Sequence, residues 1–474
     1  MTKTKNRHGR ITQTSSTIIE TVEQLKAYLQ TAVQLEHATI PPYLTAAYSA
    51  KIEANKASSD IIRAVAKEEM LHFALAANLL NAIGGQPDLL KPGFVPHYPT
   101  YLPTGQDDFN VGIERFSNHT LQTFLDIERP SSPNLKHAKI VRQIKKTIPI
   151  ASRHIDKSLL KDSFVPIKKV GGKYELHYTI NVIPHNHLTR KRRRISEERK
   201  SLIPHVPPKS SENNPIQLHY WSIGEFYKAI HLGFVELTNK IGEKALFSGD
   251  SSKQVPPKSL AHKIEKASPT GDSRKQIPPQ SYYSAGGELK VVTNLKTALA
   301  AIDFIAGQGE GGNDSVYDDQ NELAHYYRFD QIQKKRYYQV PAPDGKNRDK
   351  AGHPRGGRFP VTMKAVFPIK ANAKVADYHD DLQLEERALL FNGQYKRFLE
   401  KLNTAFNGKP DILIGAFFRA EMFSIKVAME KLIHYEILGT GECASPTFEM
   451  DRFKYPPHSP TSPSLASAKG GTHG

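Results

Sequence analysis

Two short segments of the chain each carry a glutamate and a histidine three residues apart. Glu69 and His72 lie in KEEMLHFALAANLL, and Glu322 and His325 lie in NELAHYYRF. On an α-helix this spacing places both side chains on one face, so a carboxylate and an imidazole can bind one metal ion. One such pair is a weak signal, but two pairs beside apolar stripes in separate halves of the chain are a strong one. We therefore expect these four residues to bind metal and to take part in catalysis.

Two further carboxylates would complete a two-metal site. Di-metal carboxylate bundles take a Glu-x-x-His pair from each of two helices and a single glutamate from each of the other two. Glu36, in QLEHATIPPYL, falls midway along the first predicted helix, where an antiparallel partner would face Glu69. Glu225 and Glu310 are alternatives for the last position. Glu225 could equally close a capping box with Ser222, and Glu310, between two glycines, could equally mark a helix end.

Several neighbours of these residues are candidates for supporting roles. We expect Glu68 to face solvent or to support a ligand from behind, and His37 to be a structural histidine. Tyr326, Tyr327 and Arg328 could be core and salt-bridge residues. They could also orient the adjacent histidine and supply redox-active phenols.

Any metal bound by this chain must rely on oxygen and nitrogen ligands. The chain has a single cysteine, Cys443, which excludes an intramolecular disulfide framework and thiolate clusters built from one chain. Carboxylates with imidazoles suit iron or manganese better than copper, and zinc stays an alternative. We therefore expect two metal ions, iron in the first place and manganese in the second.

Helical periodicity positions the candidate ligands. Apolar residues at three- and four-residue steps predict helices over 18–49, 58–83, 222–243, 290–308 and 319–333, with two more near 382–406 and 410–437. We expect the first helix to kink or break at Pro41-Pro42. The second ends at Gly84-Gly85 and forms an antiparallel hairpin with the first through a loop near Asn55.

These elements predict a mainly α fold, a four-helix bundle with additional C-terminal helices and irregular or β-containing insertions. We divide the chain into a disordered N-terminus (1–17), a first helical hairpin (18–92), an irregular insertion with a β-like run at 173–183 (93–215), the second half of the bundle (216–335), an accessory helical region (336–455) and a disordered tail (456–474). The segment 241–259 recurs as 263–281. The Pro, Ser and Lys content of this duplication predicts a surface insertion over 244–285.

Charge and hydropathy bear on partners rather than on fold. The 65 Lys and Arg against 48 Asp and Glu give a formal net charge of +17, part of it in the basic run 188–200. We interpret this run as an exposed loop, with binding to nucleic acid or another polyanion as the lesser alternative. The sequence has no apolar run of about 18 residues that would predict a membrane span. The N-terminus also lacks a secretory signal, so we expect a cytoplasmic protein.

Five motifs resemble one known family. LEHATIPPYLTAAYS, EEMLHFALAANLLNAIGG, IGEFYKAI, QGEG and ELAHYYRF are similar to the ferritin-like domain of iminophenyl-pyruvate dimer synthases, enzymes of violacein- and rebeccamycin-type pathways. The resemblance is close over residues 20–92, runs in blocks over 216–335 and continues loosely to SPTFEM at 445–450. It implies a ferritin-like four-helix bundle. The basic run, the duplication and Ser445, where a glycine is expected, depart from the family pattern without touching the ligand positions.

The resemblance also implies a reaction. The synthases of that family couple two oxidised, imine-bearing indole pyruvate molecules. We therefore expect a non-haem di-iron oxidase or oxygenase that acts on a small, amino-acid-derived metabolite, with oxygen or peroxide as the oxidant. The alternatives are an iron-handling ferroxidase and a non-enzymatic module that binds polyanions through the basic run. The sequence is compatible with a homodimer as well as with a monomer.

Overall fold

The structure is a computed structural model that describes residues 19–104, 108–132, 141–150, 165, 167–183, 218–256, 289–310, 316–318, 322–339, 353–413 and 416–450. Its α-helices are α1 (Val22–Ser49), α2 (Ile52–Ala82), α3 (Asn118–Ile127), α5 (Ile223–Ile241), α6 (Glu243–Leu246), α7 (Leu295–Glu310), α8 (His325–Lys334), α9 (Leu382–Phe406) and α10 (Ala416–Ile433). Its strands are β1 (Arg142–Pro149), β2 (Ile167–Val170), β3 (Lys173–Val182), β4 (Glu436–Ile437) and β5 (Glu442–Cys443). Short 3₁₀ turns occur at η2 (Ser251–Lys253), η5 (Val375–Tyr378) and η6 (Pro410–Leu413).

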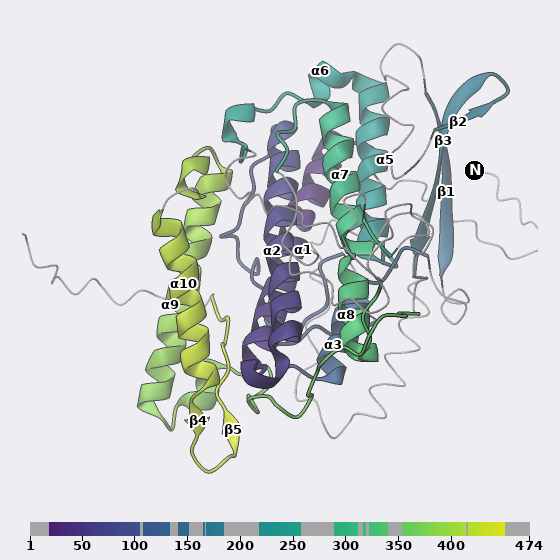
Figure 1. Ribbon diagram of the computed structural model, residues 1–474. Helices are drawn as coiled ribbons and strands as arrows, with labels where there is room; N and C mark the ends of the chain where they lie inside the picture. The colour runs from purple at the N-terminus through teal and green to yellow at the C-terminus, as the bar shows by residue number, and fades with distance from the viewer. Residues whose placement is uncertain are drawn as a thin grey trace, which may run out of the picture.

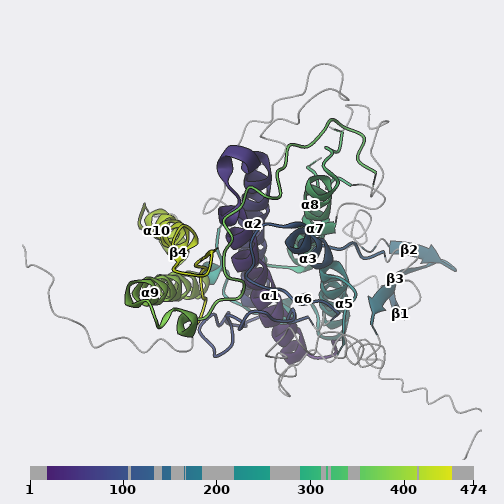
Figure 2. The ribbon, with the colours of Figure 1, turned by 90° about the horizontal axis from the view of Figure 1, so that it is seen from below.

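The helices lie in three layers. The α1–α2 hairpin is in the centre, the α9–α10 pair covers one side of it, and α5, α7, α3 and α8 cover the other (Figures 1 and 2). Apolar side chains from all three layers join one continuous core. A small antiparallel sheet of order β1-β3-β2 lies on the outer side of α5. The fold is therefore mainly α, with added C-terminal helices and small β-containing insertions, which confirms the predicted fold class.

The layer that faces α1 and α2 on one side is built from helices stacked end to end. Figure 1 shows α5 and α7 in its upper part and α3 and α8 in its lower part. At mid-height α3 ends at Ile127 and α7 ends at Glu310, while α5 begins at Ile223 and α8 begins at His325. Helix ends leave backbone groups without intrahelical partners. This level of the bundle can therefore hold polar side chains inside an otherwise apolar core.

Helix α1 runs without a break through the two prolines that were expected to interrupt it. It starts at a capping box in which Thr21 accepts a hydrogen bond from the backbone N–H of Gln24, and it continues to Ser49. Pro42 has no N–H to offer the carbonyl of Ala38. The hydroxyl of Tyr98 donates a hydrogen bond to that carbonyl at 2.9 Å instead. The predicted break is therefore wrong, and the carbonyl that Pro42 leaves without a donor is bonded by a side chain from outside the helix.

Helix α2 begins earlier than its sequence pattern indicates. It starts at Ile52, and the turn expected near Asn55 is a single non-helical residue inside it, with φ −134° and ψ 24°. The Asn55 side chain donates to the carbonyls of Thr362 and Ala365 and accepts from the Thr362 N–H. The bend in α2 is thus held by a segment far along the chain.

The later helices follow the predicted ranges to different degrees. Helix α9 has the predicted bounds, and α10 ends at Ile433, a few residues before the predicted end. Helix α5 begins after Ser222, whose hydroxyl accepts from the Glu225 N–H as an N-cap. The predicted β-like run 173–183 is strand β3. Helix α8 begins at His325, later than expected, and this changes the candidate site.

Several expectations fall outside the described residues. They concern both chain ends, the basic run 188–200 and the second copy of the duplication. The first copy contains α6 and η2, and it packs on α2 through Asn78, whose side chain bonds both the carbonyl and the N–H of Val255. None of the described helices combines the length and apolarity needed to cross a bilayer.

Candidate metal centre

Buried carboxylates and imidazoles meet at the mid-height of the bundle. Glu36 comes from the middle of α1, and Glu69 and His72 come from the middle of α2. Glu128 is the C-cap of α3, and His325 is the first residue of α8. Each of these five residues exposes 4% or less of its surface. The central hairpin and the interrupted layer therefore supply one common site.

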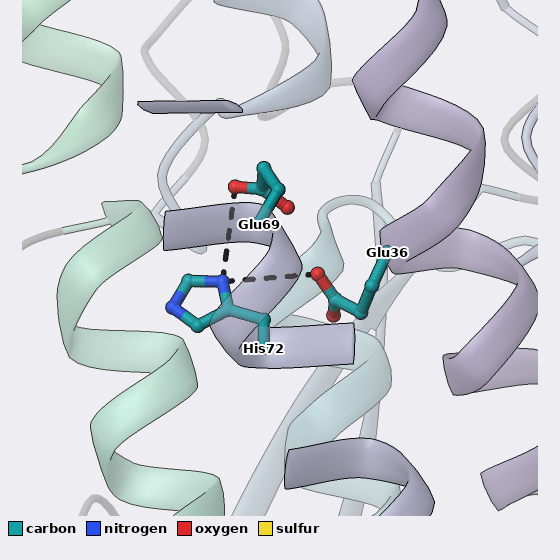
Figure 3. Close-up of side chains that lie close together, drawn as sticks. All are labelled: Glu36, Glu69 and His72. Carbon is teal, nitrogen blue, oxygen red and sulfur yellow. Dashed lines mark ion pairs between the residues drawn. The ribbon is translucent and has the colours of Figure 1, made fainter. Parts of the chain in front are cut away.

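The first group of possible ligands comes from the central hairpin. Glu36, Glu69 and His72 each direct one ligand atom into a common space (Figure 3). The Nδ1 atom of His72 lies 3.7 Å from Glu36 Oε2 and 3.7 Å from Glu69 Oε1. On α2 the two residues lie one turn apart, as the sequence spacing predicts.

The second group shares Glu69 with the first. Glu69, Glu128 and His325 have ligand atoms that lie within 4.8 Å of one another. The Nδ1 atom of His325 lies 2.9 Å from Glu69 Oε1 and 3.6 Å from Glu128 Oε2. The rings of His72 and His325 are stacked with their centroids 5.5 Å apart. Glu69 thus stands between two imidazole–carboxylate groups, where it could bridge two ions.

These separations fit metal coordination. Protein nitrogen and oxygen ligands lie about 2.0–2.2 Å from transition-metal ions such as zinc, so two ligands of one ion are separated by about 3–4 Å. His72 Nε2 donates a hydrogen bond to the amide oxygen of Gln308 at 2.9 Å, and His325 Nε2 donates to Glu68 at 2.6 Å. In a neutral imidazole the other nitrogen, Nδ1, then carries a lone pair. Both lone pairs face carboxylate oxygens, an arrangement that requires either a proton or a cation between them.

The electrostatics of the cluster show the same need for positive charge. Burial and the charge of Glu69 raise the pKa of Glu36 well above its ordinary value and also raise the pKa of Glu128. Burial favours the neutral form of His325, but the carboxylates around it, Glu128 first, hold the pKa of its imidazole well above the usual range. Nδ1 of His325 is also buried and makes no hydrogen bond to the described residues. Metal binding would replace the protons that the cluster otherwise attracts.

Tyrosine hydroxyls hold the outer oxygens of the two terminal carboxylates. Tyr227, from α5, donates a short hydrogen bond to Glu36 Oε1. Tyr43, from α1, donates to Glu128 Oε1 at 2.6 Å. In each carboxylate the other oxygen, Oε2, is the one that faces an imidazole. The two phenols therefore fix which oxygen each carboxylate presents to the centre.

The two imidazoles are held from behind by different groups. His72 bonds to Gln308 near the end of α7, whereas His325 bonds to Glu68 of α2. Arg328 Nη1 donates to the second oxygen of Glu68 at 2.9 Å, and both residues are fully buried. Burial alone would raise the pKa of Glu68, but Arg328 and the hydrogen bond from His325 outweigh it and hold that pKa below its ordinary value. Of the two expectations for Glu68, support of a ligand fits and a solvent-facing position does not.

Glu322 does not occupy the place that its spacing to His325 predicts. It lies before α8, where Tyr317 and Leu323 form an isolated antiparallel bridge. Its backbone N–H bonds to Asp318 at 2.8 Å, and its carboxylate lies 3.6 Å from Arg328 Nη2. Because the helix starts only at His325, the two side chains do not share a helical face. Glu322 is part of neither ligand group.

Glu225 and Glu310, the two alternatives for the last carboxylate, lie near each other but outside the ligand groups. Glu225 accepts from the backbone and side chain of Asn181 and pairs with Lys228 at 2.8 Å. Glu310 accepts from the N–H and hydroxyl of Ser131 and from the Ser222 hydroxyl. Among the described residues these contacts connect the mid-height ends of α5 and α7 to the insertion.

Glu128, which was not predicted from the sequence, lies with Glu69 and His325 where Glu225 or Glu310 was expected. Helix α3 lies in a Pro-rich stretch and spans only Asn118–Ile127. It is too short for a long apolar periodicity that would predict it from the sequence. A weaker signal exists. Glu128 follows Leu121 and Phe124 at steps of three and four residues, which places it on the apolar face of that helix. Leu121 and Phe124 are both fully buried.

The adjacent histidine on α1 faces the other layer. His37 Nε2 lies 2.9 Å from the Tyr395 hydroxyl of α9, and the ring packs against Phe94. Burial lowers the pKa of His37 to about 3, so the ring is neutral. These contacts fit the structural role expected for it.

Comparison with protein families agrees with this architecture. The family model described as Ferritin-like matches residues 29–334, which is more than half of the chain. A crystal structure of a ferritin-like protein from Caulobacter vibrioides is similar at 19% identity with a TM-score of 0.45, covering 87% of this chain and 95% of that chain. No curated protein sequence matches this one significantly. The matched range begins within α1 and ends with α8, so it includes all five residues of the cluster. The chain belongs to the ferritin-like family.

Proposed function

We propose that this protein is a non-haem di-metal oxidoreductase that acts on a small, amino-acid-derived metabolite with oxygen or peroxide as the oxidant. The observation that carries the proposal is the pair of buried three-ligand groups that share Glu69. A single structural ion would need one group. Two groups with a common carboxylate are typical of the di-iron carboxylate bundles.

The ligand types support iron or manganese. Three carboxylates and two imidazoles form the set, and both kinds of ligand suit these ions. A pair of such ions supplies one-electron steps and the activation of oxygen or peroxide. The chain's own residues would hold the ions: Glu69 is common to the two positions, Glu36 faces His72, and Glu128 faces His325. Because the whole set is buried, bulk water is kept from the centre.

The tyrosines and the outer partners of the imidazoles give the site its rigidity. Tyr227 and Tyr43 each hold one carboxylate oxygen, while Gln308 and Glu68 hold the ring orientation of the two histidines. Outer partners of this kind fix the tautomer of a ligating imidazole and raise its basicity. These contacts limit the movement of the side chains that would bind metal.

The substrate class rests on the sequence resemblance. The motifs around Glu36, His72 and His325 resemble the ferritin-like domain of iminophenyl-pyruvate dimer synthases, which supports an imine or keto acid derived from an aromatic amino acid. Ferroxidase activity without an organic substrate stays the alternative. Polyanion binding through residues 188–200 also stays a prediction, since that run lies outside the described residues.

The proposal is tested by loading metal-free protein with ferrous iron under nitrogen, adding oxygen, and following oxygen uptake with and without a panel of amino-acid-derived imino and keto acids. We expect uptake that an organic acid accelerates and that Glu69→Gln abolishes. Glu53→Gln, the same change at an exposed position of α2, is the matched control and should keep full activity. Oxygen uptake that is equal in the two variants would overturn the proposal. Iron oxidation that no organic acid accelerates would favour the ferroxidase.

A further inference from the structure

The two imidazoles of the cluster have the same geometry toward the centre but different chemistry behind them. Each presents Nδ1 inward and donates a hydrogen bond from Nε2. The acceptor for His72 is the neutral amide oxygen of Gln308 at 2.9 Å. The acceptor for His325 is the carboxylate of Glu68 at 2.6 Å. The two histidines therefore differ in the charge of the group that accepts their Nε2 hydrogen bond.

Glu68, the carboxylate that accepts the hydrogen bond from His325, forms a buried ion pair that favours its charged form. Arg328 Nη1 lies 2.9 Å from Glu68 Oε1, and neither side chain has any exposed surface. Arg328 is fixed in turn, because its Nε donates to the carbonyl of Leu323 and its Nη2 lies 3.6 Å from Glu322. Hydrogen bonds to an ionised acceptor are roughly twice as strong as those between neutral groups. The shorter bond of His325 agrees with this.

An anionic acceptor makes an imidazole a stronger electron donor. When Nε2–H points at a carboxylate, the ring gains negative character, and its Nδ1 lone pair becomes more basic toward a cation. An amide oxygen does this to a much smaller extent. His325 is therefore the stronger electron donor to a metal ion, and His72 is the weaker one.

We propose that the two metal positions are unequal, and that the Glu68–Arg328 pair makes the position at His325 the tighter one, which fills first. The inference rests on the proposed di-metal function and adds an order of loading to it. Glu68 and Arg328 act as positioning residues, because they reach the centre only through His325. Loss of an outer partner lowers metal affinity by about 10- to 100-fold, so we expect a difference of about that size between the two positions.

One structural feature favours metal binding at the His72 position instead. The ligands of the His72 position all come from the α1–α2 hairpin, whereas those of the His325 position come from α2, α3 and α8. In the unfolded chain, ligands that lie close in the sequence would bind a metal ion more readily, which would favour the His72 position. In the folded protein the side chains of both positions are similarly buried, with exposures of 4% or less. The difference in donor strength is therefore what separates the two affinities.

The test is a titration of metal-free protein with cobalt(II) alone, followed by calorimetry and by the visible absorption of the bound ion. Wild-type protein should bind about two ions in two steps that differ by about 10- to 100-fold in affinity. Gln308→Glu places a carboxylate behind His72 and should bring the two steps together by strengthening the weaker one. Glu68→Gln should bring them together by weakening the tighter one. Crystals grown with one equivalent of cobalt should show an anomalous peak beside His325.

Each result supports or overturns the inference. Because Glu68→Gln leaves Arg328 without its closest carboxylate and could prevent folding, Glu68→Gln with Arg328→Gln removes both charges and serves as the second variant. Two equal steps in wild-type protein, a first ion beside His72, or a wider separation of the steps in Gln308→Glu would overturn the unequal loading. Equal steps with two bound ions would leave the di-metal proposal standing, whereas no metal binding at all would overturn both.

Discussion

Replacing Glu128 with glutamine removes one charge from the cluster and preserves the size of the side chain. The glutamine can still accept the hydrogen bond from Tyr43, because its amide oxygen can take the place of Oε1. The change therefore separates the metal-binding role of Glu128 from its packing role. Glu322→Gln is the matched control, since the spacing in the sequence assigned Glu322 to this centre and the structure assigns Glu128.

The expected effect of this change on stability is small without metal and large with metal. Facing ligand atoms of Glu69 and Glu128 lie within 4.8 Å of one another. Two charges at this separation repel by about 3 kcal/mol at an effective dielectric constant of about 20. Metal-free Glu128→Gln loses this repulsion, but it also loses the attraction between Glu128 and the His325 imidazole, whose Nδ1 lies 3.6 Å from Glu128 Oε2. The two effects largely offset each other, so metal-free Glu128→Gln should be within about 1 kcal/mol of metal-free wild type. Loss of a ligand should also weaken the His325 position by at least about 100-fold, which is about 3 kcal/mol of binding free energy.

The assay is thermal and urea unfolding of both forms, together with metal content by elemental analysis. Wild type should gain stability on metal loading, and Glu128→Gln should gain much less and retain about one ion per chain instead of about two. Glu322→Gln should keep the wild-type metal content. If Glu128→Gln keeps both ions, the assignment of Glu128 is refuted.

Three further predictions concern the scaffold. A Cβ at Gly224 would overlap Glu310 Oε1, so Gly224→Ala should cost about 1–3 kcal/mol in urea unfolding, whereas Gly307→Ala, with nothing within 4 Å, should be neutral or slightly stabilising. Equal effects of the two changes would contradict the overlap. Burial lowers the pKa of His231 to about 3, so only the unfolded chain gains a proton below pH about 6.5, and stability should fall by about 2 kcal/mol between pH 7 and pH 5. His231→Gln should lose this part of the acid sensitivity, and an unchanged pH profile would speak against it. Asn55→Ala removes the hydrogen bonds to segment 362–365 and should cost about 2 kcal/mol, and an unchanged midpoint of unfolding would show that they contribute nothing.

Local periodicity predicted the helices whose ends are set by their own sequence. Helix α9 has the predicted bounds because Asp381 caps its start and its apolar stripe runs unbroken to Phe406. The hairpin ligands Glu36, Glu69 and His72 also depend only on two long helices packed against each other. The structure brings these three residues together, as their spacing predicts, and their binding of metal stays a prediction.

The remaining ligands depend on contacts between distant segments. The pairing of Tyr317 with Leu323 keeps Glu322 out of α8, and no local signal shows that pairing. The carbonyl that Pro42 leaves without a donor in α1 is bonded by Tyr98, which lies in another part of the chain. Glu128 enters the centre because α3 packs beside α8. The sequence could therefore indicate the chemistry of the centre but not its complete ligand set.

The most direct test of the di-metal centre is anomalous diffraction at the iron absorption edge from crystals loaded with ferrous iron under nitrogen. We expect two peaks about 3–4 Å apart, one beside His72 and one beside His325, with Glu69 contacting both. One peak, two peaks that do not share Glu69, or no peak at the cluster would contradict the di-metal centre.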